Sequence, residues 1–143
     1  AALHIDVLRG CACPVVLTPH DGEFLRLGGD PKADDRTREA MRLASRSHTV
    51  VLLKGSRTVI TDGLNTYVNH TGNPGLATGG SGDVLTGVIG ALLAQGMEPF
   101  AACCAAVWLH GRAGDLAAEE KGRRGMTPLD IIEMLPYALK EVE

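Results

Sequence analysis

Short apolar runs separated by polar turns divide the first half of the chain. Residues 14–17 and 49–53 are apolar or β-branched almost throughout, as strands buried on both faces of a parallel sheet are. Residues 58–61 and 66–68 flank a glycine-containing loop at 62–65, which is typical of an antiparallel hairpin. The pattern predicts parallel central strands followed by a hairpin at the edge of the sheet.

Helical spacing predicts five helices between and after these strands. A short helix follows residue 20, with Asp21 or Gly22 as its cap, and an amphipathic surface helix covers about residues 34–47. Later helices are predicted at the following positions: 84–95, 99–119, and from Thr127 onward, where Pro128 and Asp130 suit the first turn.

Two features of the later helices predict how they pack. In the helix over 84–95, Gly87 and Gly90 lie on nearly one face, which would allow another backbone to approach closely. In the last helix, an apolar stripe is expected to face inward, formed by Leu129, Ile132, Leu135, Ala138 and Val142.

The composition predicts a single globular domain and argues against nucleic acid or a membrane surface as a partner. The 143 residues are 45% hydrophobic and 22% charged, enough apolar material for one globular core over 1–143. The net charge of -3 gives no electrostatic footprint for nucleic acid or an anionic membrane surface. No run of about 18 apolar residues is present, so no membrane span is expected. The first residue is Ala1 rather than Met, and we expect the sequence to begin inside a longer reading frame.

The four cysteines have neither zinc-site nor redox-motif spacing. They occur as Cys11-Ala12-Cys13 and Cys103-Cys104. We expect reduced, buried thiols in a cytoplasmic protein.

A glycine-rich loop before the helix at 84–95 is the strongest chemical signal in the chain. In Gly79-Gly80-Ser81-Gly82-Asp83, successive backbone N–H groups can point into one concavity at a helix N-terminus, where a phosphate fits. Asp83 could then take the proton from a hydroxyl that attacks a phosphoryl group. The alternative is a glycine-rich turn in which Asp83 only complements the helix dipole.

Three further positions could take part in chemistry. The turn Lys54-Gly55-Ser56-Arg57-Thr58 follows a central strand, where open α/β sheets bind ligands, although Lys54 could equally be solvated. His20, with Glu23 to orient it, could donate to a substrate, or could simply be exposed. His110 is interpreted as a structural, hydrogen-bonding histidine near Asp115.

These motifs carry a family resemblance. The run of residues 73–85, Asn-Pro-Gly-Leu-Ala-Thr-Gly-Gly-Ser-Gly-Asp-Val-Leu, resembles the signature of the ADP/ATP-dependent NAD(P)H-hydrate dehydratases of the ribokinase-like superfamily. The segments at 17–23, 53–55 and 109–115 support it in the same order. The resemblance implies a ribokinase-like three-layer αβα fold with a mainly parallel central sheet, of which this chain is the C-terminal part.

The resemblance also implies an activity and residue roles. Hydrated NADH or NADPH would be dehydrated while ADP or ATP is converted to AMP or ADP plus phosphate. Asp83 would be the base and a substrate contact, with His20 and Glu23 on the hydrate side. Two stretches would bind the nucleotide: Lys54, Gly55, Ser56, Arg57 and Thr58, and the anion hole of Gly79, Gly80, Ser81 and Gly82. Mg²⁺ would accompany the nucleotide, although no cluster of metal ligands is visible.

The remaining expectations concern partners and alternatives. We expect a homo-oligomer, with a fused epimerase domain upstream as a further possibility, and we expect this chain alone to be poorly soluble or to associate because a half-sheet exposes an apolar edge. The alternatives are another ribokinase-like small-molecule kinase and an inactive nucleotide-binding fragment.

Overall fold

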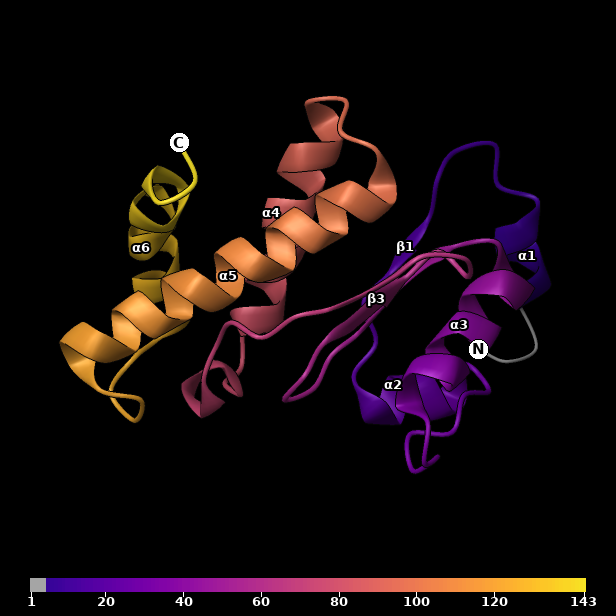
Figure 1. The fold of residues 1–143 in the computed structure, drawn as a ribbon, viewed down its shortest axis with the longest axis horizontal. Helices are drawn as coiled ribbons and strands as arrows, with labels where there is room; N and C mark the ends of the chain where they lie inside the picture. Colours follow the sequence, from indigo (N-terminus) through magenta and orange to yellow (C-terminus); the bar gives the residue numbers. More distant parts are fainter. Residues whose placement is uncertain (1–4) are drawn as a thin grey trace. The chain divides into compact units, whose positions relative to one another are not determined.

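The computed structural model describes residues 5–143, which form two compact units, the first ending at Asn69 and the second covering His70–Glu143 (Figure 1). Residues 1–4, where the sequence is expected to begin inside a longer reading frame, lie outside the described residues. Each unit is considered by itself.

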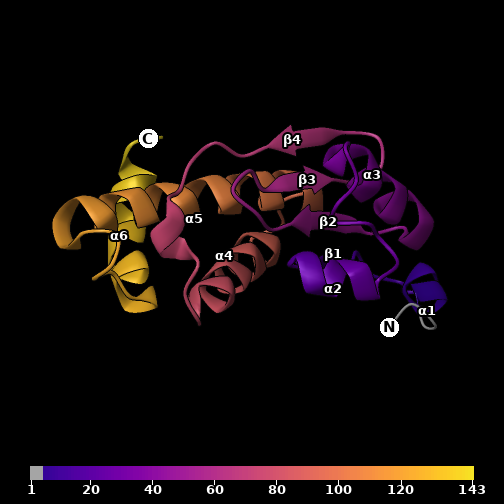
Figure 2. The ribbon, with the colours of Figure 1, turned by 90° about the horizontal axis from the view of Figure 1, so that it is seen from below.

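A mixed four-stranded sheet organises the first unit, with β1 (Val16–Leu17), β2 (Val50–Leu53), β3 (Val59–Thr61) and β4 (Thr66–Val68) side by side in this order (Figure 2). β1 and β2 are parallel, with Val16 opposite Val50, while β3 pairs antiparallel with both of its neighbours. All four residues of β2 are buried, as expected of a central strand. The predicted strands and the hairpin are confirmed.

Three helices accompany this sheet: α1 (Ile5–Arg9), α2 (Asp21–Arg26) and α3 (Arg36–Ser47). α3 packs on β2 and β3, and its buried Leu43 and Ala44 share a core with Phe24, Val51 and Leu53. The side chain of Asp35 accepts a hydrogen bond from the Arg38 N–H, 2.9 Å away, and so caps α3. This core holds the ends of β1 and β2 in place.

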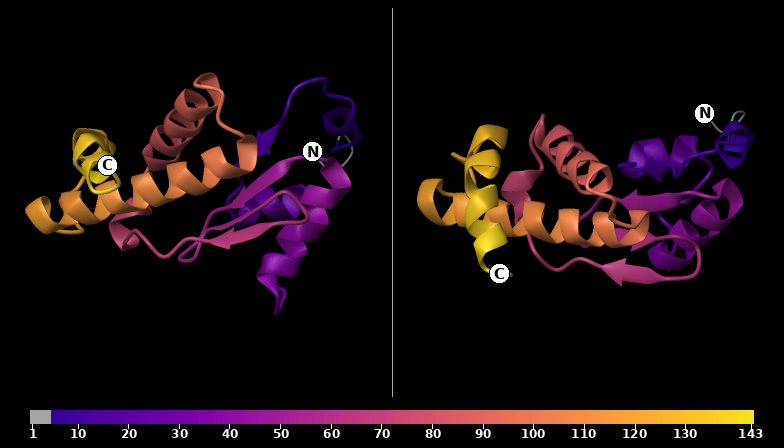
Figure 3. Two further views of the ribbon diagram at one scale, coloured as in Figure 1. Left: turned by 45° about the horizontal axis from the view of Figure 1, so that its top comes forward. Right: turned by 90° about the horizontal axis from the view of Figure 1, so that it is seen from above.

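The second unit is helical. A 3-10 turn, η2 (Pro74–Leu76), leads to α4 (Ser81–Ala94), α5 (Pro99–Lys121) and α6 (Pro128–Lys140). α5 is the long central helix against which both α4 and α6 pack (Figures 1 and 3). α4 begins at Ser81, three residues before the predicted start, so the glycine loop runs directly into the helix.

The predicted inward stripe of α6 is wrong in most of its positions. Leu129, Ile132 and Val142 are exposed, and Ile131, which was not in the stripe, is fully buried. Ala138 is fully buried and Leu135 half-buried in the core shared with α5, as predicted. α6 carries apolar residues around most of its circumference, and its rotation is set by polar contacts at its two ends. Thr127 and Asp130 form the predicted capping box, and Asp130 also pairs with Lys121 of α5.

The glycines of α4 do not receive another backbone in this structure. A Cβ placed on Gly87 or on Gly90 would meet no atom within 4 Å. The expectation of a close backbone approach is therefore wrong among the described residues.

The cysteines only partly match their prediction. All four are free, but Cys11 and Cys13 are exposed, because they lie in the turn after the short α1, while Cys103 is buried in α5. Burial raises the pKa of the Cys103 thiol to about 12. In the described part of the chain, no helix is both long and apolar enough to span a membrane.

Candidate functional site

The glycine loop forms a set of backbone donors at the N-terminus of α4. Gly80 is the N-cap and has a left-handed backbone with φ of 91°, which glycine adopts without strain. Among the described residues, the N–H groups of Gly79, Gly80 and Gly82 have no hydrogen-bond partner. Free N–H groups together with the positive end of the helix dipole favour a bound anion. The anion hole itself stays a prediction.

Asp83 stands in the first turn of α4 and is exposed. Its own N–H bonds back to the Gly80 carbonyl at 3.1 Å, which ties it to the loop. No hydrogen bond or ion pair involves its carboxylate within the described residues, so the group is free to meet a ligand.

His110 lies beneath this turn, on α5. Its Nε2 is 3.0 Å from the Ser81 carbonyl oxygen and 3.2 Å from the Ser81 Oγ, and both residues are buried. Burial lowers the pKa of His110, which favours the neutral ring. The predicted hydrogen-bonding role is confirmed, but the partner is Ser81 and not Asp115. Residues five apart on a helix point about 140° away from each other, so His110 and Asp115 face different neighbours.

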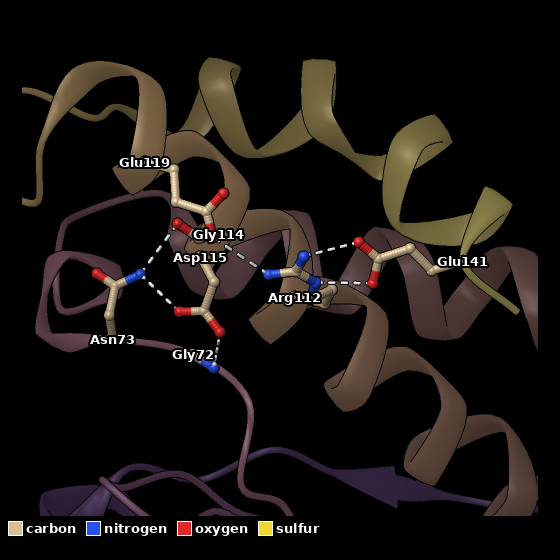
Figure 4. A network of polar contacts seen from close by, with 7 residues as sticks. All are labelled: Gly72, Asn73, Arg112, Gly114, Asp115, Glu119 and Glu141. Atoms are coloured by element: carbon tan, nitrogen blue, oxygen red, sulfur yellow. Dashed lines mark hydrogen bonds and ion pairs between the residues drawn. The ribbon is translucent and has the colours of Figure 1, made fainter.

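Asp115 instead anchors the loop that precedes the glycines (Figure 4). Its carboxylate accepts from the Gly72 N–H at 2.9 Å and from Asn73 Nδ2 at 3.0 Å. Asn73 Nδ2 also donates to the Gly114 carbonyl, and Asn73 Oδ1 accepts from the Gly75 N–H, both at 2.9 Å. Asn73 and Asp115 were not assigned a role from the sequence. Their only sequence signal was that Asn73 lies in the motif at 73–85 and Asp115 in the motif at 109–115. That signal does not show that the two motifs contact each other.

Glycines on α5 let the same loop lie close to the helix. A Cβ on Gly111 would lie 2.8 Å from the Thr71 carbonyl oxygen, and one on Gly114 would lie 2.9 Å from Leu76 Cγ. At these distances a Cβ would force the loop backbone at Thr71 or the side chain of Leu76 to shift. Loop 71–76 is therefore fixed by both packing and hydrogen bonds.

An ion-pair network around Arg112, which lies three residues before Asp115 on α5, holds α6 (Figure 4). Arg112 binds both carboxylate oxygens of Glu141 at 2.7 Å and lies 3.4 Å from Glu119. This paired arrangement lowers the pKa of Glu141 and raises that of Arg112. Its role is to fasten α6 rather than to face the glycine loop.

In the first unit, His20 is the N-cap of α2, a role predicted for Asp21 or Gly22. Its Nδ1 accepts from the N–H groups of Gly22 and Glu23 at 3.0 and 3.3 Å, and Glu23 accepts from the His20 N–H at 2.9 Å. The sequence prediction missed this because histidine is not among the usual capping residues. The hydrogen bond that the Glu23 carboxylate accepts from the His20 N–H lowers the pKa of Glu23. With Nδ1 an acceptor, the neutral ring carries its proton on Nε2, which lies 3.6 Å from Glu23 Oε1.

The turn containing Lys54 lies beside the His20 loop. The Lys54 N–H donates to the Pro19 carbonyl at 2.9 Å, joining the ends of the two parallel strands. Arg36 braces both loops, with 2.6 Å to the Lys54 carbonyl and 2.7 Å to Asp21. The structure thus brings together His20, Glu23 and Lys54, the groups predicted on the two strand ends.

The rest of that turn faces solvent. Gly55, Ser56 and Arg57 are exposed, and Thr58 is half-buried, donating to the Gly55 carbonyl. In the described residues, no group of three or more His, Cys, Asp or Glu side chains could hold a metal ion.

With this geometry in place, comparison with known proteins decides the family. The family model described as NAD(P)H-hydrate dehydratase matches residues 2–137. The chain belongs to the NAD(P)H-hydrate dehydratase family.

Relatives extend this result. The chain is 49% identical over 142 residues to the bifunctional NAD(P)H-hydrate repair enzyme Nnr of Moorella thermoacetica, covering 96% of this chain and 27% of that protein. It is 37% identical to the ADP/ATP-dependent NAD(P)H-hydrate dehydratase of Bacillus subtilis, co-crystallised with ATP and Mg²⁺ and soaked with CoA, with a TM-score of 0.85 over 91% of this chain and 50% of that one.

A third relative bears on the fold. A ribokinase-like superfamily protein of Enterococcus faecalis is 34% identical, with a TM-score of 0.80 over 98% of this chain and 49% of that one. The predicted ribokinase-like α/β class is thereby confirmed. The chain spans about half the length of the Bacillus subtilis protein and about half the length of the Enterococcus faecalis protein.

Proposed function

We propose that the protein dehydrates hydrated NADH or NADPH, as the S epimer, back to NADH or NADPH, with ADP or ATP converted to AMP or ADP plus phosphate. The observation that carries the proposal is the set of free N–H groups of Gly79, Gly80 and Gly82, with the unpaired Asp83 carboxylate one residue on. Family membership supplies the substrate class, and the ADP/ATP-dependent relative from Bacillus subtilis supports the nucleotide.

The reaction would proceed in two steps. Asp83 takes the proton of the ring hydroxyl of the hydrate as that oxygen attacks the terminal phosphoryl group, and the bond to the leaving AMP or ADP breaks. Phosphate then leaves its ring carbon with the bonding electron pair, the adjacent ring carbon loses a proton to water, and the electron pair of that C–H bond restores the double bond. The N–H groups of the glycine loop stabilise the charge that develops on the phosphoryl oxygens.

The strand-end groups are assigned to the two ligands. His20 would donate from Nε2 to the hydrate, with Glu23 orienting it, because both already belong to one rigid capping box. Lys54 and the exposed residues Gly55 to Thr58 would line the AMP moiety. The backbone bond between Lys54 and Pro19 supports a joint role for the two loops.

Mg²⁺ is assigned to the nucleotide and not to a resident site. The described residues form no cluster of metal ligands, so they do not fit a metal held by the protein alone. Mg²⁺ commonly stays bound by phosphate oxygens and water with few protein ligands, and it would enter here as part of the nucleotide substrate.

Organisation in the cell is also a proposal. The Moorella thermoacetica relative is named bifunctional, which supports a second activity, an epimerase, fused upstream. The four free cysteines are compatible with a cytoplasmic location. Assembly as a homo-oligomer stays a prediction.

The test uses the full-length protein that carries this sequence. It is mixed with hydrated NADH and Mg²⁺, ADP and ATP are added in separate runs, and the absorbance of reduced nicotinamide is followed. Return of absorbance only with nucleotide supports the dehydratase and identifies the donor. A phosphorylated product without restored absorbance supports the small-molecule kinase alternative, and nucleotide binding without turnover supports the inactive fragment.

Substitution of the base sharpens this test. We expect Asp83→Asn to lower turnover by about a hundredfold or more while nucleotide binding survives. Asp34→Asn, at an exposed aspartate in the first unit, is the matched control and should leave turnover unchanged. Unchanged turnover in Asp83→Asn would show that Asp83 is not the base.

A further inference from the structure

The contact between His110 and Ser81 has a defined direction. A carbonyl oxygen can only accept, so the 3.0 Å contact to the Ser81 carbonyl requires the proton of His110 to be on Nε2. The same N–H lies 3.2 Å from the Ser81 Oγ. Both residues are more than nine-tenths buried, so the bond is protected from competition by water.

The Ser81 carbonyl and the Gly82 N–H belong to one peptide group. That group is planar and trans, so fixing the oxygen at one end fixes the direction of the N–H at the other. The Gly82 N–H is one of the free donors at the start of α4. A hydrogen bond accepted by the carbonyl also polarises the peptide and makes its N–H a better donor.

We propose that His110 is a positioning residue for phosphate recognition: it holds the Ser81–Gly82 peptide from behind, so that the Gly82 N–H is aimed at the phosphoryl group. Asp83 follows directly in the same turn, so the same contact helps to hold its backbone. This inference rests on the proposed function, because it deepens the role of the glycine loop as the phosphate site.

Three variants of His110 separate this role from simple packing. Gln can place an amide nitrogen near the position of Nε2 and keep the donor. Leu keeps a similar volume without a donor, and Asn keeps the amide but is too short to reach Ser81. Asn also serves as the comparison if the Leu variant does not fold.

Binding of ADP and of adenosine to the full-length protein is measured by calorimetry for each variant. If His110 acts through the peptide that faces phosphate, His110→Leu and His110→Asn should weaken ADP binding about tenfold, the equivalent of about one hydrogen bond. Adenosine, which has no phosphate, should bind within about twofold of the unchanged protein. His110→Gln should restore ADP binding to within about threefold.

The outcomes are separable. An equal loss for ADP and adenosine, or no loss for ADP, overturns the positioning role. If the unchanged protein binds ADP but does not restore NADH, the proposed function fails while the ADP–adenosine comparison still decides the role of His110. If it binds neither ADP nor ATP, the glycine loop is no phosphate site and both proposals are overturned.

Discussion

Replacement of Asp115 tests how the loop before the glycines is held. Asp115→Ala removes two hydrogen bonds to a carboxylate, from the Gly72 N–H at 2.9 Å and from Asn73 Nδ2 at 3.0 Å. Bonds to a charged acceptor contribute about 1.5–3 kcal/mol each. Since Asp115 is only partly buried, the lower end applies, and we expect a loss of about 3 kcal/mol in the free energy of unfolding.

The assay is equilibrium unfolding in urea, followed by the fluorescence of Trp108, which lies on α5 near this contact. Glu119→Ala is the matched control, because Glu119 is an acid one turn further along α5. Its single contact, 3.4 Å to Arg112, is exposed, and its loss should cost about 0.5 kcal/mol or less.

A double-mutant cycle isolates the pair. Asn73→Ala removes the same bond to Asp115 together with two backbone contacts. We expect Asp115→Ala and Asn73→Ala to be non-additive by about 1 kcal/mol or more. A cost for Asp115→Ala no larger than that of Glu119→Ala would refute the reasoning that this carboxylate fixes the loop.

Three further predictions follow from individual contacts. Gly111→Ala places a Cβ 2.8 Å from backbone atoms of the loop and should destabilise the protein by about 2 kcal/mol. Gly90→Ala adds a Cβ with no atom within 4 Å and should stabilise the protein by about 0.5–1 kcal/mol. Thermal unfolding of the two variants checks both values. Lys121 holds the pKa of Asp130 at about 2, below an unfolded value of about 3.9, so this stabilisation is present above about pH 4 and is lost as the pH falls toward 2. Urea unfolding between pH 2 and 5 should show a shallower pH dependence in Asp130→Asn, and equal slopes would count against the ion pair. The buried Cys103, with its pKa raised to about 12, should resist alkylation at pH 7.5 in the folded protein and react after denaturation, as read by mass spectrometry.

Local patterns in the sequence predicted the strands and every described α-helix except α1, because each depends on nearby residues. The apolar run at 49–53 and the hairpin loop at 62–65 are examples, and both are found where they were expected. The capping box at Thr127 is another. The N-cap of α2 was missed because His20 replaces the usual hydroxyl or carboxylate acceptor with a ring nitrogen.

Rotation of a helix about its axis is less accessible from sequence. α6 has apolar side chains on several faces, so periodicity alone placed Ala138 correctly but chose Leu129 and Ile132 in place of the buried Ile131. The choice depends on Asp130 pairing with Lys121 and on Glu141 pairing with Arg112. These partners are 9 and 29 residues apart in the chain, and no local pattern relates them.

The same limit applies to the site. Gly79 to Asp83 could be recognised as a donor loop because its chemistry is contained in five consecutive residues. Its supports could not, since they come from another helix: His110 contacts Ser81 in this loop, and Asp115 holds the loop that precedes it.

All of these supports lie within residues 70–143. α5 holds the start of α4 through His110, holds the preceding loop through Asp115, and allows both to come close through Gly111 and Gly114. Preorganised donors stabilise charge best when they need not move as it develops. If the glycine loop binds phosphate as proposed, α5 meets this requirement from behind: the motif at 73–85 would present the donors, and the motif at 109–115 would keep them in place.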